Sequence, residues 1–75
     1  MKTDAEIRDI IRHNIKKLRI DAGKTQGEVA AYCGKSENAV GSWEQGLSLP
    51  DLVTMVKLSR LYGVTLDYLY GEVDE

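Results

Sequence analysis

The sequence predicts a small all-α protein, a compact bundle of five helices in a single domain. Three observations lead to this prediction. Apolar residues recur every three or four positions in five separate segments. Each segment follows a Thr, Ser or Asp that can act as an N-cap, and each is closed by a glycine. With 75 residues there is room for only one domain. We expect helices over about residues 4–22, 26–33, 37–45, 52–62 and 66–70 of a domain spanning 1–71.

The first helix should begin after Thr3, because Glu6 completes a capping box with it. An apolar stripe at steps of three and four predicts the face that this helix buries: Ile7, Ile11, Ile15, Leu18 and Ala22. Ile10 lies off the stripe and, together with Ile7, either covers a neighbouring element or joins a second subunit. His13 is expected on the solvent face.

The two central helices are short and are joined by a tight turn at Gly34. Thr25 and Glu28 form a capping box for one, and Ser36 caps the other. Their predicted inward residues are Val29, Ala30, Cys33, Val40 and Trp43. So short a turn makes the helices cross steeply, which is the helix-turn-helix arrangement. In its DNA-binding versions, the second helix enters the major groove and the first crosses the backbone.

The fourth helix should follow Asp51, because Pro50 disfavours helix at the residue before it. Its expected inner face comprises Leu52, Met55, Leu58 or Ser59, and Tyr62. Thr65 caps a short last helix, and residues 72–75 form an acidic tail that we expect to be frayed.

The central motif T-Q-G-E-V-A-A-Y-C-G-K-S-E-N-A-V-G-S-W-E-Q-G resembles the phage-repressor-like helix-turn-helix family, which includes Cro, lambda-repressor and xenobiotic-response-element proteins. The likeness extends from about Ile15 to Gly71. It implies a five-helix lambda-repressor-like fold and a transcriptional regulator, repressor-like in type. It also implies a homodimer that binds double-stranded DNA at a palindromic operator, in the cytoplasm of a bacterium and associated with its nucleoid.

The resemblance also assigns roles to residues of this motif. The family's base-contacting positions fall on Glu37, Asn38 and Ser42. Asn pairs with adenine, Glu accepts from cytosine, and Ser is permissive. Its backbone-contacting positions fall on Gln26, Ser36 and Gln45, to which Lys35 is a natural addition. The simpler alternatives are that Glu37 only favours the helix dipole and that Asn38 and Ser42 are solvated surface.

Two further assignments follow from the family. An arginine at the end of the first helix pairs with the glutamate of the W-E-x-G motif, so Arg19 and Glu44 are expected to form a structural ion pair. Relatives often dimerise through the last helix, which makes Tyr68 a dimer candidate, together with Leu61 and Val53. The alternative for Tyr68 is ordinary burial against the core.

Charge and composition set limits on function. The formal net charge is −2, and residues 25–51 contain one basic residue, Lys35, against four acidic ones. This excess of negative charge supports a second hypothesis, a protein-interaction module that keeps the fold and serves a regulator or a toxin. The sequence contains no acid–base pair, no activated nucleophile and no glycine-rich phosphate loop, so an enzyme is not expected. With one cysteine and one histidine, neither a metal site nor a disulfide is expected, and no cofactor is expected either. No apolar run is long enough for a membrane span.

Overall fold

A computed structural model of the chain describes residues 1–71. These residues form an all-helical bundle, which confirms the predicted fold class. The five helices are α1 (Asp4–Asp21), α2 (Gln26–Cys33), α3 (Glu37–Gln45), α4 (Leu52–Tyr62) and α5 (Leu66–Leu69). The acidic tail predicted at 72–75 lies outside the described residues.

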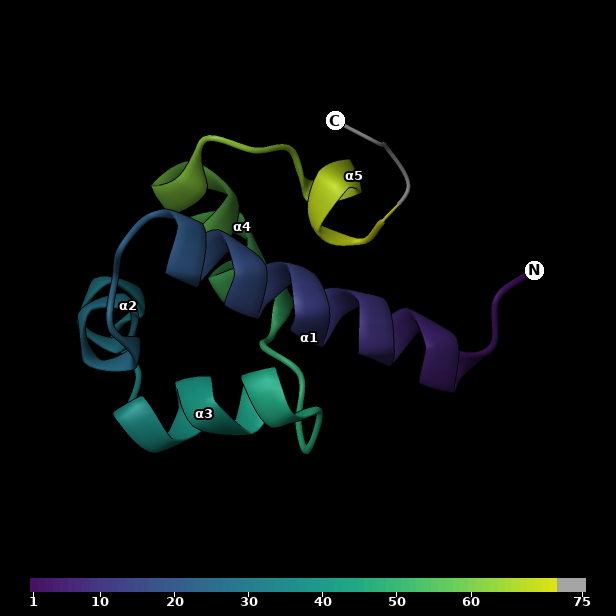
Figure 1. The fold of residues 1–75 in the computed structure, drawn as a ribbon, viewed down its shortest axis with the longest axis horizontal. Helices are drawn as coiled ribbons and strands as arrows, with labels where there is room; N and C mark the ends of the chain where they lie inside the picture. The colour runs from purple at the N-terminus through teal and green to yellow at the C-terminus, as the bar shows by residue number, and fades with distance from the viewer. Residues whose placement is uncertain (72–75) are drawn as a thin grey trace.

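The long helix α1 runs through the middle of the molecule, and the other helices are arranged around it (Figure 1). Helix α3 lies along one side of α1, and α5 lies on the opposite side. In the same view α2 is seen end-on, while α3 runs across the picture, so the two helices cross steeply. Helix α4 packs against α2 and α5 and closes the bundle. Among the helices of residues 1–71, none combines the length and the apolar character that crossing a bilayer requires.

Local capping explains where the helices begin and end. The capping boxes predicted at Thr3 and Thr25 are both formed, with the threonine and glutamate exchanging hydrogen bonds with each other's backbone N–H. Two predicted ends were one residue too long. Helix α1 ends at Asp21 rather than residue 22, and α5 ends at Leu69 rather than residue 70. In both cases the next residue is the C-cap, whose N–H is still bonded to the preceding turn.

The core is built from the residues that the apolar spacing selects on α1, α2 and α3. Val40 is fully buried, and Trp43 is 5% exposed. Around them are packed the other buried apolar side chains: Ile11, Ile15, Val29, Ala30, Cys33, Met55, Leu58 and Leu69. Burial of this kind is the main driving force for folding in a chain with no disulfide among the described residues.

Three residues predicted to face inward do not. Ile7 is 38% exposed because the first turns of α1 extend beyond the rest of the bundle (Figure 1). Ala22 is exposed because it stands at the C-cap, after the last helical turn. Leu52 is 67% exposed in the first turn of α4, whereas Met55 and Leu58 of the predicted inner face are buried, together with Thr54.

A polar residue of α1 fixes the position of α5. The Asn14 side-chain nitrogen donates to the carbonyl oxygens of Tyr68 and Leu69, each at 3.2 Å. The last carbonyls of a helix have no partner within the helix, so this amide satisfies two of them. Ile10 is half-buried and lies against Gly71, directly after α5. Of the two roles considered for Ile10, covering a neighbouring element is the one that this contact supports.

Candidate nucleic-acid interface

Helices α2 and α3 are positioned by a turn of only three residues, 34–36. Gly34 has φ of 69°, a left-handed conformation that closes α2 and that a residue with a Cβ adopts only at a cost. Ser36 follows, and its hydroxyl accepts a hydrogen bond from the Ala39 N–H at 3.1 Å. The turn therefore ends one helix and starts the next without a linker, which gives the steep crossing of a helix-turn-helix.

Five of the predicted contact residues line one shallow hollow of about 300 Å³ on the outer side of α3. They are Gln26, Glu37, Asn38, Ser42 and Gln45. Asn38 and Gln45 are exposed, because Val40 and Trp43 occupy the opposite, buried side of the helix. The hollow is therefore a polar surface made by α3 and the first residue of α2. Hydrogen-bonding groups on such a surface can meet the edges of bases.

Two further residues, Gly41 and Leu47, line the same hollow and were not predicted as site residues. A Cβ at Gly41 would meet only the Gln26 amide, at 3.8 Å, which is an ordinary contact. Leu47 is 73% exposed directly after α3. The spacing could have indicated Gly41, since residue 41 lies on the same helical face as Asn38 and Gln45.

Three side chains of the hollow already have contacts within the protein that the sequence did not indicate. The Gln26 side-chain nitrogen donates to Glu44 Oε1 at 3.2 Å, so this glutamine also has a structural partner. The Ser42 hydroxyl lies 2.7 Å from the Ser48 hydroxyl in the loop after α3. Glu37 extends toward α2, where its Oε1 atom is 2.9 Å from the position that a Cβ on Gly27 would occupy. A negative charge there is favourable for the N-terminal end of α2.

Arg19 and Glu44 join α1 to α3 behind this surface. Arg19 Nε donates to Glu44 Oε2 at 2.6 Å, and Arg19 Nη2 donates to Oε1 at 2.9 Å. Their side chains are 15% and 3% exposed, so the pair is largely shielded from solvent. Burial by itself raises the pKa of Glu44, but the hydrogen bonds from Arg19 and Gln26 outweigh it and hold that pKa below its usual value. The same contact with Glu44 raises the pKa of Arg19.

The two remaining predicted backbone contacts lie outside the hollow. The hydroxyl of Ser36 is engaged as the N-cap of α3. The Lys35 ammonium lies 3.5 Å from Asp51 Oδ2 in an exposed ion pair. Both residues stand at the N-terminal end of α3, where they border the surface without lining its centre.

The dimer candidates Tyr68 and Leu61 are both half-buried. Leu61 packs against the core, so only part of its side chain is free for another subunit. The larger exposed apolar surface nearby in sequence is at the start of α4, where Leu52 and Val53 are 67% and 66% exposed. Sequence reasoning assigned Leu52 to the core and therefore missed it here.

Cys33 and His13 take no part in this surface. Cys33 is 1% exposed in the core, and burial raises the pKa of its thiol despite the nearby charges of Lys57 and Lys35. His13 is on the solvent side of α1. Within residues 1–71, no three potential metal-ligating side chains are close enough to hold an ion.

The comparisons with known proteins agree with this geometry. A family model described as helix-turn-helix matches residues 15–69, which is most of the chain. The chain belongs to this helix-turn-helix family. The matched range contains α2, α3, α4, α5 and the last seven residues of α1.

Individual relatives are regulators by name. The chain is 40% identical to the HTH-type transcriptional regulator ImmR of Bacillus subtilis over 77% of its own length and 46% of ImmR. It is 33% identical to the uncharacterized HTH-type transcriptional regulator y4dJ of Sinorhizobium fredii, over 93% of this chain and 91% of that protein. The hypothetical transcription factor NHTF from Neisseria has a similar fold, with a TM-score of 0.78, 24% identity and coverage of 93% and 82%. The chain spans about half the length of most of the curated regulators that it matches.

Proposed function

We propose that this protein is a DNA-binding transcriptional regulator that places α3 in the major groove of double-stranded DNA. The observation that carries the proposal is the hollow on α3, in which Asn38 and Gln45 are exposed while Val40 and Trp43 hold the helix to the core. Family membership and the names of ImmR and y4dJ support the same function. A repressor of phage type is the form that the relatives favour, since one of them is the CTXphi repressor RstR of Vibrio cholerae.

Within this proposal the residues have separate roles. Glu37, Asn38 and Ser42 read base edges, and Gln26, Lys35, Ser36 and Gln45 contact the backbone. The hydroxyl of Ser42 retains this role only in competition with Ser48, which already bonds to it. Asn38 is the strongest reading residue, because it is exposed and its amide can donate and accept toward one adenine.

We further propose that the protein acts as a homodimer on a palindromic operator in the bacterial cytoplasm. Two copies related by a two-fold axis would present two α3 helices about one DNA turn apart, ~34 Å. We assign the contact between copies to the exposed apolar pair Leu52 and Val53, in addition to the half-buried Leu61 and Tyr68. Sedimentation of the parent and of Val53→Asp tests the arrangement. A dimer that becomes a monomer in the variant supports it, and a monomeric parent that binds DNA contradicts it.

The function itself is tested by selection from random double-stranded DNA, run at two salt concentrations. Enrichment of a two-fold symmetric sequence is the expected result. Binding should weaken as salt rises, because counterions are released from the phosphates. No enrichment at low salt, together with a stoichiometric protein partner in a pull-down, would favour the protein-interaction module instead. The acidic stretch around α3 is the observation that keeps this second function in view.

A further inference from the structure

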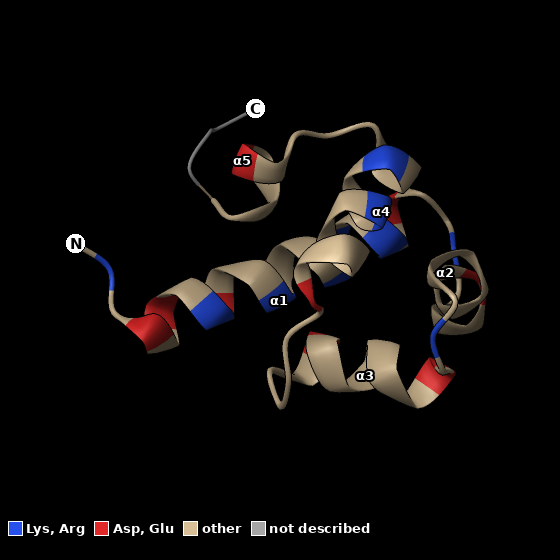
Figure 2. Ribbon diagram, turned by 180° about the vertical axis from the view of Figure 1, so that it is seen from behind, with Lys and Arg blue, Asp and Glu red and all other residues tan. Residues whose placement is uncertain are grey.

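The residues around α3 provide little positive charge for a polyanion. Between residues 25 and 51, Lys35 is the single basic residue, and it is paired with Asp51 at 3.5 Å. Figure 2 shows acidic but no basic colour along the α3 ribbon, whereas α1 carries several basic positions. Because phosphate neutralisation supplies most of the sequence-independent affinity for DNA, the cations must come from another element.

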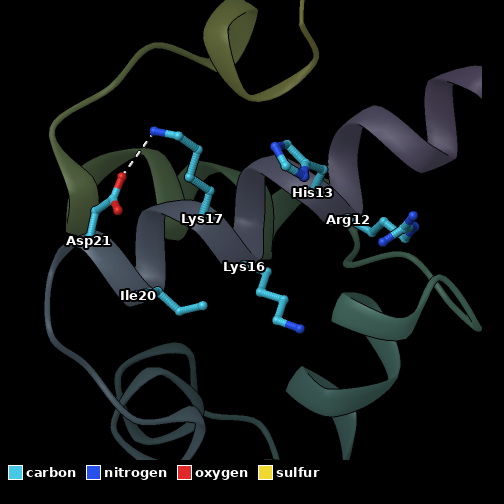
Figure 3. Close-up of a pocket in the computed structure, with 6 residues that line it drawn as sticks. All are labelled: Arg12, His13, Lys16, Lys17, Ile20 and Asp21. Carbon is cyan, nitrogen blue, oxygen red and sulfur yellow. Dashed lines mark hydrogen bonds and ion pairs between the residues drawn. The ribbon is translucent and has the colours of Figure 1, made fainter.

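One face of α1 brings basic side chains beside α3. Arg12, Lys16 and Arg19 are spaced by four and three residues, so they lie on the same side of the helix. Arg12 Cδ is 3.0 Å from the position that a Cβ on Gly46 would occupy, at the C-cap of α3. Lys16 points from α1 toward α3 (Figure 3) and its charge helps to hold the pKa of Glu44 low, while Arg19 is bonded to that glutamate. The basic side chains of this face of α1 therefore lie beside the C-terminal end of α3.

The neighbouring lysine points elsewhere. Figure 3 shows Lys16 leaving α1 toward the side of α3, whereas Lys17 leaves it on the opposite side and pairs with Asp21 at 3.0 Å. Lys17 is also near Tyr68 of α5. The two adjacent lysines thus carry equal charge but leave α1 in different directions, although both line one pocket with Arg12. Lys17 is a matched control for Lys16.

The loop after α3 makes the position of Arg12 significant. When a helix lies in the major groove, phosphates border it at both ends. At the N-terminal end of α3 the chain offers Gln26, Lys35 and Ser36. At the C-terminal end the loop 47–50 reads Leu-Ser-Leu-Pro and has no charged side chain. Arg12 packs on Gly46 and therefore brings a cation to this end of α3.

We infer that Arg12 and Lys16 of α1 bind DNA phosphates beside the C-terminal end of α3. This inference rests on the proposed function and assigns most of the electrostatic affinity to α1. Both side chains reach solvent. Arg12 is paired with Asp9 through Nε, 2.7 Å from Oδ1, and through Nη2, but its side chain is 40% exposed and its guanidinium has further N–H donors. Lys16 is exposed and makes no ion pair within residues 1–71.

The test compares Arg12→Gln, Lys16→Gln and the double variant with the control Lys17→Gln. Binding is measured by fluorescence anisotropy between ~50 and ~200 mM salt. Two duplexes of about two turns (~20 base pairs) are used, one of mixed sequence and one taken from the selection. Each substitution at 12 or 16 should weaken binding to both duplexes alike and should reduce the slope of log K against log salt by about one. The double variant should lose about two, and Lys17→Gln should keep the parent's slope.

Two results overturn the inference while leaving the proposed function intact. One is an unchanged slope in the double variant. The other is an equal loss of slope in Lys17→Gln, which would mean that only the total charge matters. A parent that binds neither duplex at any salt concentration overturns the proposed function as well. Circular-dichroism melting of each variant confirms that these surface substitutions leave the fold in place.

Discussion

Glu44 at the end of α3 accepts hydrogen bonds from Arg19 of α1 through both of its carboxylate oxygens, at 2.6 and 2.9 Å. The same carboxylate accepts a third bond from Gln26 at the start of α2. One nearly buried acidic side chain thus connects the three helices whose relative positions define the surface proposed to bind DNA. Four predictions follow from this connection and from the geometry around it.

The first prediction concerns the ion pair itself. Glu44→Ala should lower the free energy of unfolding by about 3 kcal/mol, because Arg19 is left with little solvent and no opposite charge. Thermal and urea denaturation measure the loss. Lys17→Ala is the control, since it removes an ion pair whose two side chains are more than half exposed, and it should leave the melting temperature nearly unchanged. Equal melting temperatures for the parent and Glu44→Ala would contradict the structural role.

The second prediction is a pH dependence. Because the pKa of Glu44 is lowered in the folded protein, the unfolded chain binds more protons between the two pKa values. Stability therefore rises with pH in that range. The contribution of Glu44 is complete above its usual pKa of 4.5 and is lost as the pH falls through the lower, folded value.

The variant Glu44→Gln isolates this effect from other carboxylates with lowered pKa, such as Glu28 and Asp51, whose hydrogen bonds to helix N-termini remain in both proteins. Urea denaturation of the parent and the variant is measured from neutral to acidic pH. The stability difference should shrink below about pH 4.5. A difference independent of pH would show that the charge of Glu44 contributes nothing.

The third prediction uses two glycines, Gly41 in the middle of α3 and Gly46 at its C-cap. Gly41→Ala should raise the free energy of unfolding by up to ~1 kcal/mol, because alanine is the better helix former and the new methyl meets only ordinary contacts. Gly46→Ala should have the opposite sign. Its φ is 77°, and the added Cβ would lie 3.0 Å from Arg12 Cδ.

DNA binding then separates stability from function at the same site. The Gly41→Ala methyl stands in the proposed contact surface, so affinity for the selected duplex should fall although the protein is more stable. Anisotropy titrations and melting curves give the two quantities. Unchanged affinity in this stabilised variant would mean that DNA does not approach Gly41 closely.

The fourth prediction distinguishes residues that recognise bases from residues that contact the DNA backbone. Asn38→Ala should remove the preference at one base position, worth about 1–3 kcal/mol of discrimination. Gln26→Ala should weaken binding to all sequences alike, and it should also lower the melting temperature because Glu44 loses a donor. Repeating the selection with each variant shows which pattern holds. Retention of the full sequence preference by Asn38→Ala would remove Asn38 from the reading set.

Much of the fold was predictable because its signals are local. A capping box such as Thr25 with Glu28 needs only neighbouring residues, and apolar residues at helical spacing select Val40 and Trp43 for the core without knowledge of the partner helices. The predictions of buried side chains failed near the ends of helices, where the apolar spacing continues although neighbouring helices no longer cover the side chain. Ile7 and Leu52 are the examples, and both are exposed.

The sequence by itself determined the five helices, their order and the glycine turn that makes α2 and α3 cross steeply. It also determined the family. The tertiary structure alone decided several contacts between side chains that neither the spacing nor the family indicated. It gave Gln26 a partner in Glu44, Ser42 a partner in Ser48, α5 its anchor on Asn14, and α1 a basic face beside α3. These contacts join residues from different helices or loops, and their distances depend on how the helices pack. No spacing within one segment contains that information.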